Sequence, residues 1–193
     1  WINPTGAAAR IIELLRELGH RGVNVAAVEC SLITDRVLQL IDRILENGQP
    51  TATLAPSLIS AEVYLGAEPI VEALKAGADI VVTGRVADPS IFMAPLMFEF
   101  GWDPLDHARL GLGNGLGHLL ECGAQVTGGY FPDPGFKDVP EPWNLAFPIA
   151  EVSEDGTAVI AEVAGTGGAV TLQTVKEQML YEVHDPSNYL TPD

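Results

Sequence analysis

The stretch ADIVVTGRVADP (residues 78–89) predicts a buried strand, a turn and the start of a helix. Residues 80–82 are an apolar β-branched run, of the kind found in parallel strands that are covered on both faces. Asp88 followed by Pro89 is the pattern of a helix N-cap and a first-turn proline. Because open α/β sheets bind ligands beyond the carboxyl ends of their strands, the turn between these elements is a candidate site.

On both sides of this stretch, helical and strand-like patterns alternate. Residues 23–28 form a second short apolar run, and four segments have helical periodicity or helix-end signals: 4–18, 35–47, 68–76 and 89–100. This alternation predicts an α/β fold with a mostly parallel sheet flanked by helices, in a Rossmann-like three-layer arrangement.

The character of the chain changes after Gly123, where prolines interrupt a long loop. Residues 148–152 and 157–163 flank the turn sequence Ser-Glu-Asp-Gly, which predicts a β-hairpin, and a last helix is expected over 172–183. We therefore expect an α/β core over residues 1–130 and a hairpin-bearing lobe over 131–193, packed on the core within one domain.

The composition limits the possible partners. The 193 residues include 26 acidic and 10 basic side chains, a formal charge of −16, so nucleic acids and anionic membrane surfaces are poor partners. No apolar run is long enough to span a bilayer. The only two cysteines, Cys30 and Cys122, are expected to be free thiols in a reducing cytoplasm. The absence of an initial Met suggests a piece of a longer protein.

Reactive side chains are concentrated in GHLLECGAQVTGGY (residues 117–130). His118, Glu121 and Cys122 share one face if this stretch is helical, because they are spaced i, i+3 and i+4. General acid/base catalysis by His118 and Glu121 is the preferred interpretation, ahead of metal binding and of a nucleophilic Cys122. A metal site is not predicted, since no further ligands stand at a recognisable spacing.

Other polar residues complete the candidate site. Asp88 is interpreted as a helix cap ahead of a catalytic group. Arg85 is either a ligand for a carboxylate or phosphate or the partner of an acidic residue in an ion pair. The glycine-rich run 111–117 lacks the G-x-G-x-x-G spacing, so we do not predict a dinucleotide site there. The loop 165–168 precedes a helix and either holds an anion or only forms a turn. The candidate substrate-binding residues are Thr83, Gly84, Arg85, Gln125, Thr127, Tyr130, Thr166 and Gly167.

Several of these segments resemble one protein family. Residues 64–67, 78–89, 117–130, 166–168 and 180–186 are similar to the family of acyclic terpene utilisation protein A (AtuA), and the chain resembles a fragment of its N-terminal domain. The resemblance implies a cytoplasmic bacterial protein, encoded with enzymes that degrade citronellol and geraniol as coenzyme A thioesters. It brings no established reaction, and the cofactor is unknown.

Three hypotheses follow for the function. The first is an enzyme that acts on a branched or terpenoid acyl-CoA, or a related acid, by general acid/base chemistry. The second is a non-catalytic partner or subunit of an acyl-CoA carboxylase of the same pathway, and the third is a metal-dependent enzyme. A small-molecule substrate is expected in the first case, with homo-oligomers or association with pathway enzymes as further options.

Overall fold

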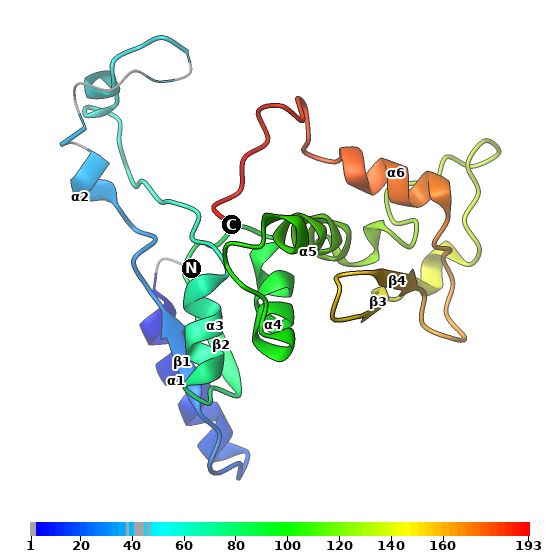
Figure 1. The fold of residues 1–193 in the computed structure, drawn as a ribbon, viewed down its shortest axis with the longest axis horizontal. Helices are drawn as coiled ribbons and strands as arrows, with labels where there is room; N and C mark the ends of the chain where they lie inside the picture. The colour runs from blue at the N-terminus through cyan, green and yellow to red at the C-terminus, as the bar shows by residue number, and fades with distance from the viewer. Residues whose placement is uncertain (1–2, 38, 41–44, 46) are drawn as a thin grey trace. The chain divides into compact units, whose positions relative to one another are not determined.

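The computed structural model describes residues 3–37, 39–40, 45 and 47–193. The chain divides into two compact units, Trp1–Ala87 and Asp88–Asp193, and Figure 1 shows the elements of each. The described residues form a mixed α/β structure with one parallel and one antiparallel pair of strands. The three-layer arrangement stays a prediction. Within the described ranges, no helix combines the length and the apolar character that a membrane span requires.

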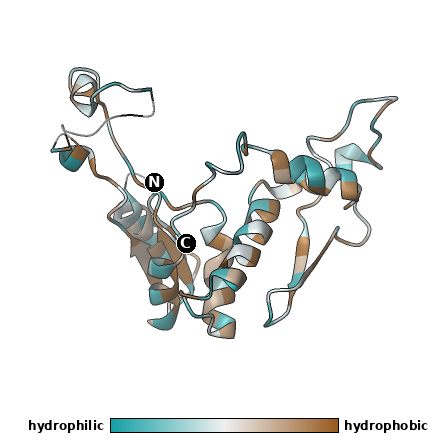
Figure 2. Ribbon diagram, turned by 45° about the horizontal axis from the view of Figure 1, so that its top comes forward, coloured by the Kyte–Doolittle hydropathy of each residue, from teal (hydrophilic) through white to brown (hydrophobic). Residues whose placement is uncertain are grey.

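The first unit is built around two parallel strands. β1 (Val25–Val28) pairs with β2 (Ile80–Thr83), with Val25 opposite Ile80 and Val28 opposite Thr83. Figure 2 colours both strands as largely hydrophobic. Helices α1 (Pro4–Glu17) and α3 (Glu68–Lys75) contact both strands. The strands predicted around residues 23–28 and 79–82 are therefore present, but most of their residues are half-buried and only Val28 is buried.

The sequence Asn3-Pro4 predicts an N-cap followed by a first-turn proline, and α1 begins as predicted. The side-chain oxygen of Asn3 accepts a hydrogen bond of 2.8 Å from the backbone N–H of Gly6, and Pro4 is the first helical residue. Asparagine at the N-cap satisfies an otherwise free donor, and proline at the next position loses no helical hydrogen bond.

The predicted helix over residues 35–47 is described only in part. α2 (Thr34–Val37) covers its beginning, and a 3-10 turn, η1 (Thr51–Leu54), follows further on. Leu38 and Ile41, which the pattern places on the apolar face of this helix, lie outside the described residues.

The second unit combines three helices and a hairpin. α4 (Ser90–Phe100) and α5 (His107–Leu120) contact each other extensively, and α6 (Leu172–Leu180) contacts α5. The strands β3 (Ile149–Val152) and β4 (Ala158–Ala161) pair antiparallel, which confirms the predicted hairpin. Two 3-10 turns complete the unit, η2 (Gly123–Gln125) and η3 (Pro142–Asn144).

The predicted N-cap at Asp88 is one residue too early. α4 begins at Ser90, and the N–H of Met93 donates to the carbonyl oxygen of Pro89 at 3.0 Å. Pro89 therefore provides the first helical carbonyl and occupies the N-cap position instead of Asp88.

Helix α5 contains four glycines, which fall on two different faces. A Cβ atom on Gly113 would lie 2.9 Å from the Met93 side chain, and one on Gly117 would lie 2.5 Å from the Pro89 carbonyl oxygen. These two glycines allow α4 to approach closely. Gly111 and Gly115 have no atom within 4 Å of the same position, so that face of the helix is open.

Candidate functional site

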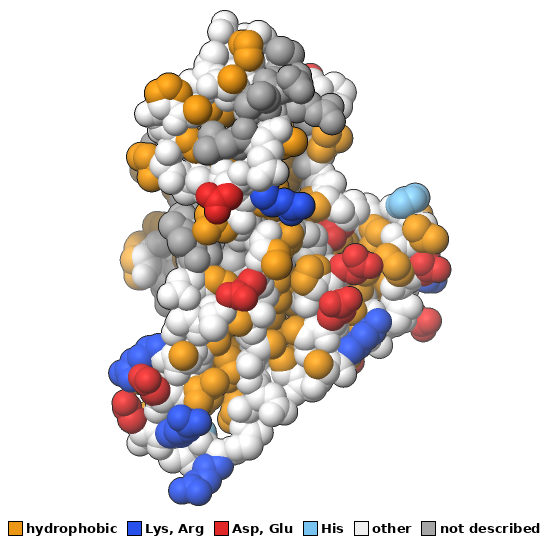
Figure 3. All heavy atoms as spheres, turned by 90° about the vertical axis from the view of Figure 1, so that its left-hand side faces the viewer, with side chains coloured by type: hydrophobic (Ala, Val, Ile, Leu, Met, Phe, Trp, Pro, Cys, Tyr) orange, Lys and Arg blue, Asp and Glu red, His pale blue; other side chains and the backbone are white. Residues whose placement is uncertain are grey.

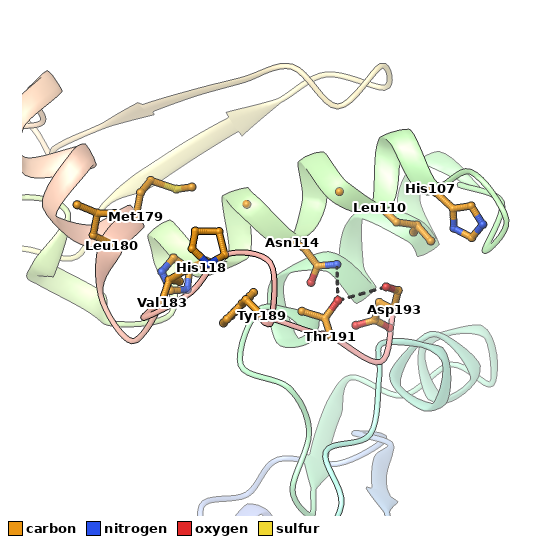
Figure 4. Close-up of a pocket in the computed structure, with 13 residues that line it drawn as sticks. His107, Leu110, Asn114, His118, Met179, Leu180, Val183, Tyr189, Thr191 and Asp193 are labelled. Atoms are coloured by element: carbon orange, nitrogen blue, oxygen red, sulfur yellow. Dashed lines mark hydrogen bonds between the residues drawn. The ribbon is translucent and has the colours of Figure 1, made fainter. Parts of the chain in front are cut away.

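The main cavity of interest lies within the second unit. Its volume is about 540 Å³, and it is bounded by one face of α5, the end of α6 and the C-terminal residues, as Figure 4 shows. Its lining residues are His107, Leu110, Gly111, Asn114, Gly115, His118, Met179, Leu180, Val183, Pro186, Tyr189, Thr191 and Asp193.

The helical repeat explains which α5 residues line the pocket. Leu110, Asn114 and His118 are spaced by four residues, so they form one row along the helix. Gly111 and Gly115 lie on the same side and add no side-chain volume, and the backbone of α5 is therefore part of the pocket wall.

His118 is held by a reciprocal pair of hydrogen bonds with Gln178 on α6. Its Nε2 lies 3.0 Å from the Gln178 carbonyl oxygen, and the Gln178 side-chain amide donates to the His118 carbonyl oxygen at 2.9 Å. A carbonyl only accepts, so Nε2 carries the proton and Nδ1 of the neutral ring holds the lone pair. Both side chains are buried, with 6% and 2% exposure. The sequence predicted the histidine but not its partner.

Tyr189 from the C-terminal segment lies beside this histidine. The two rings make an edge contact, with 6.0 Å between their centroids and an angle of 73° between their planes. Desolvation, followed by the negative charges of Asp88, Glu121 and Glu182, raises the pKa of the Tyr189 hydroxyl. Tyr189 therefore remains a protonated phenol at neutral pH and can donate a hydrogen bond.

A chain of hydrogen bonds fixes the orientation of Asn114. The Thr191 hydroxyl donates to the carbonyl oxygen of Asp193 at 3.2 Å, so it accepts from the Asn114 amide nitrogen at 3.3 Å (Figure 4). The Asn114 side-chain oxygen is buried and has no hydrogen-bond partner among the described residues. Such an acceptor is costly to leave unpaired, so this end of the pocket is suited to a donor group.

Glu121 and Cys122 follow the last turn of α5 and interact with each other. The Cys122 thiol donates to the Glu121 carboxylate at 2.7 Å. Among the described residues, no hydrogen bond joins Glu121 to His118; the Gln178 carbonyl determines the histidine tautomer instead. Burial, and after it the hydrogen bond to the neighbouring carboxylate, raise the pKa of the Cys122 thiol to about 11. This argues against a nucleophilic thiolate at neutral pH.

The raised pKa of Cys122 predicts slow alkylation. In a Cys30→Ser variant, which leaves one thiol, reaction with iodoacetamide at pH 8 is expected to involve about 0.1% thiolate. The rate should increase with pH until about pH 11, because the thiolate fraction increases about tenfold per pH unit below the pKa and levels off above it. Mass spectrometry over a pH series measures this rate. A rate that levels off below pH 9 would contradict the assigned environment.

Three other predicted site residues of the second unit form hydrogen bonds to backbone carbonyl groups of the chain. The Thr127 hydroxyl lies 2.9 Å from the Ala124 carbonyl oxygen, and the Thr166 hydroxyl donates to the Val163 carbonyl oxygen. The N–H of Gly167 donates to the carbonyl oxygen of Asn144. These three residues stabilise turns of the chain.

Two further predicted residues have different surroundings. Gln125 has a buried side-chain oxygen that finds no hydrogen-bond partner in the described part of the chain. The Tyr130 hydroxyl donates to that of Tyr181 at 3.1 Å. Neither residue lines the pocket beside His118.

The remaining predicted residues belong to the first unit or its boundary. Thr83 ends β2, and the N–H of Gly84 donates to the Val28 carbonyl oxygen, which extends the pairing of the two strands. The backbone N–H of Arg85 donates to the Ser31 hydroxyl, and its guanidinium lies 4.3 Å from the centre of the Tyr64 ring. These residues are not part of the pocket in the second unit, and neither is Asp88.

Sequence reasoning missed several residues of the pocket. Asn114 stands four residues after Leu110 and four before His118, and this spacing was the available signal. No local sequence pattern indicates Tyr189 or Thr191. They line the pocket because the C-terminal segment passes beside α5. Within the described ranges, no group of three His, Cys, Asp or Glu side chains is arranged to hold a metal ion.

The pocket combines an apolar wall with one buried imidazole and a few polar groups, which is the arrangement of a protein that binds small molecules. The family model of the acyclic terpene utilisation family protein AtuA matches residues 1–193, the whole sequence. The chain therefore belongs to the AtuA family, and the family name connects it with acyclic terpene utilisation. No curated protein and no solved structure gives a significant match.

Proposed function

We propose that this protein is an enzyme of acyclic terpene utilisation that binds a branched or terpenoid acyl group in the pocket beside His118. The acyl group is carried as a coenzyme A thioester or a related acid, and His118 transfers a proton. The observation that supports this proposal is a buried histidine, with a defined tautomer, in the wall of a largely apolar cavity.

The pocket suits a hydrocarbon chain in size and in lining. Its volume of about 540 Å³ falls within the range of about 300–1,000 Å³ that is common for small-molecule sites. Leu110, Met179, Leu180 and Val183 provide apolar surface, and the two open glycines leave room for the methyl branches of a terpenoid chain. Burial of such a chain is favourable by about 25 cal/mol per Å² of apolar surface.

The hydrogen bonds around His118 define its part in the reaction. With Nε2–H donating to the Gln178 carbonyl oxygen, the Nδ1 lone pair accepts a proton from the substrate or from water. The same carbonyl oxygen stabilises the imidazolium that results. Tyr189, a protonated phenol beside the ring, is suited to donate a hydrogen bond to the carbonyl oxygen of the substrate. This chemistry serves proton abstraction, isomerisation or hydration.

Turnover of geranyl- and citronellyl-CoA by wild-type protein and by a His118→Gln variant tests the proposal. Glutamine retains an N–H donor for the Gln178 carbonyl but cannot accept a proton, so kcat should fall about 10²–10⁴-fold. KM should change little, because the apolar wall is intact. A His184→Gln variant is the matched control, since His184 is exposed and outside the pocket. Equal kcat values for His118→Gln and the control would exclude the acid/base role.

A second candidate function is that of a non-catalytic partner of a pathway carboxylase. The observation in its favour is a group of exposed large apolar side chains around η3 and the hairpin: Trp143, Phe147, Ile149 and Val159. Exposed apolar surface of this kind is frequent at sites of protein association. Co-purification with the carboxylase, together with no thioester binding in calorimetry, would favour this function over the first.

A further inference from the structure

We propose that the first unit binds a phosphate group in a basic hollow at the carboxyl end of α1. The hollow has a volume of about 520 Å³ and lies at the loop between α1 and β1. It is lined by Ile12, Leu15, Arg16, Gly19, His20, Arg21, Gly22 and Val23. This site belongs to the first unit alone, so the proposal does not depend on the acid/base function of His118.

The charge of the hollow is opposite to that of the chain. Arg16, His20 and Arg21 line it, and no acidic residue of the described part of the chain does, although the sequence contains 26 acidic and 10 basic residues. Figure 3 shows Lys or Arg side chains at the lower end of the face, the level at which Figure 1 draws this loop, with Asp or Glu side chains beside some of them. In a chain of charge −16, an anion is attracted only where basic groups lie together.

The two arginines are not neutralised by their neighbours. The glutamates of α1 that could pair with them, Glu13 and Glu17, are both bound to Arg10, at 2.8 and 3.3 Å. Within the part of the chain that the structure describes, neither Arg16 nor Arg21 forms an ion pair. Their guanidinium groups are exposed and retain their full donor capacity for a ligand.

The backbone of the loop adds to this arrangement. The last carbonyl groups of α1 are already satisfied, since the N–H of Gly19 donates to Arg16 and that of His20 to Leu15. Gly19 and Gly22 have φ angles of 79° and 75°, in the left-handed region that glycine adopts without strain. The N–H groups of Arg21 and Gly22 donate to no acceptor among the described residues. Free N–H groups next to a left-handed residue form concavities that bind anions.

A purely structural role explains only one of the two arginines. Arg16 lies in the last turn of α1, where a cation is favourable beside the negative end of the helix dipole. Arg21 lies beyond the helix and gains nothing from that dipole. The guanidinium group of an arginine is planar and can donate two charge-assisted hydrogen bonds to the oxygens of one phosphate group. Two such groups around a hollow are therefore suited to bind a phosphate.

Calorimetric titration of the full chain tests the proposal with two probes, inorganic phosphate and adenosine 3′,5′-bisphosphate. Both should bind, and a bisphosphate that binds about 10-fold tighter or more would identify a nucleotide as the source of the phosphate. Each of Arg16→Gln and Arg21→Gln should weaken binding about 10-fold, because a charge-assisted pair is lost. Higher salt should weaken binding as well.

Lys75→Gln is the matched control, because Lys75 is an exposed basic residue of the first unit that does not line the hollow. Its affinity should stay within about 2-fold of wild type. Absence of binding by wild type at millimolar phosphate, or equal weakening in all three variants, would overturn the proposal. The His118→Gln variant should bind both probes as wild type does, so failure of one proposal is distinguishable from failure of the other.

Discussion

A Gly117→Ala variant is expected to be less stable than the wild type by about 1–3 kcal/mol, the usual cost of inserting a methyl group into a closely packed contact. The new Cβ would lie 2.5 Å from the Pro89 carbonyl oxygen and 2.7 Å from its Cα. Both atoms belong to the backbone at the start of α4, so relief requires the two helices to move apart. Urea unfolding followed by circular dichroism measures the difference in free energy.

Gly115→Ala provides the matched control two residues away on the same helix. No atom lies within 4 Å of its added Cβ, so only the gain in helix propensity remains, about 0.5–1 kcal/mol in favour of the variant. The same substitution should therefore have opposite signs at neighbouring glycines. A loss of stability at both positions would mean that the two faces of α5 are not distinguished as described.

A Gln178→Ala variant is expected to lose about 2–4 kcal/mol of stability. The side chain is 2% exposed, and its amide is the donor to the buried carbonyl oxygen of His118. Truncation leaves that oxygen without a partner and creates a cavity between α5 and α6, and both effects are destabilising. Thermal and urea unfolding of the purified variant measure the loss.

Gln173→Ala is the control for this prediction, since Gln173 is an exposed residue of the same helix. Its stability should remain within about 0.5 kcal/mol of wild type. If the two alanine variants were equally stable, the reciprocal pair between His118 and Gln178 would not be formed in solution.

Local sequence patterns predicted the helices and strands that have strong hydrophobic periodicity or clear capping and turn residues. The two short apolar strands, the cap at Asn3 and the hairpin around residues 153–156 are found where the sequence indicates them. Each depends on nearby residues only, which is why a single sequence is sufficient. The end of the last helix is less well predicted, because α6 ends at Leu180 and not at Val183.

Helix α5 was not predicted, and the reason is energetic. Glycine is the poorest helix former after proline, so a segment with four of them reads as a loop. The gain that outweighs this propensity is contact with α4, which depends on residues 89–102 and is not visible in the local pattern.

In the candidate site too, local sequence patterns indicated a residue but not its partner, which is distant in the sequence. His118 was recognisable as a reactive residue, whereas its partner is the backbone of Gln178, 60 residues further on. A backbone carbonyl leaves no signature in a sequence. A common face for His118, Glu121 and Cys122 required a helix through residue 122, but α5 ends at Leu120, and the Glu121 carboxylate accepts a hydrogen bond from the adjacent thiol.

The four glycines of α5 also have a consequence for the order of folding. Each costs about 1 kcal/mol of helix propensity relative to alanine, so the isolated segment has no tendency to form a helix in water. Since α5 gains its stability only when α4 and α6 are in place, these three helices are expected to form in one cooperative step. The wall of the pocket is therefore expected to fold and unfold together with the second unit that contains it.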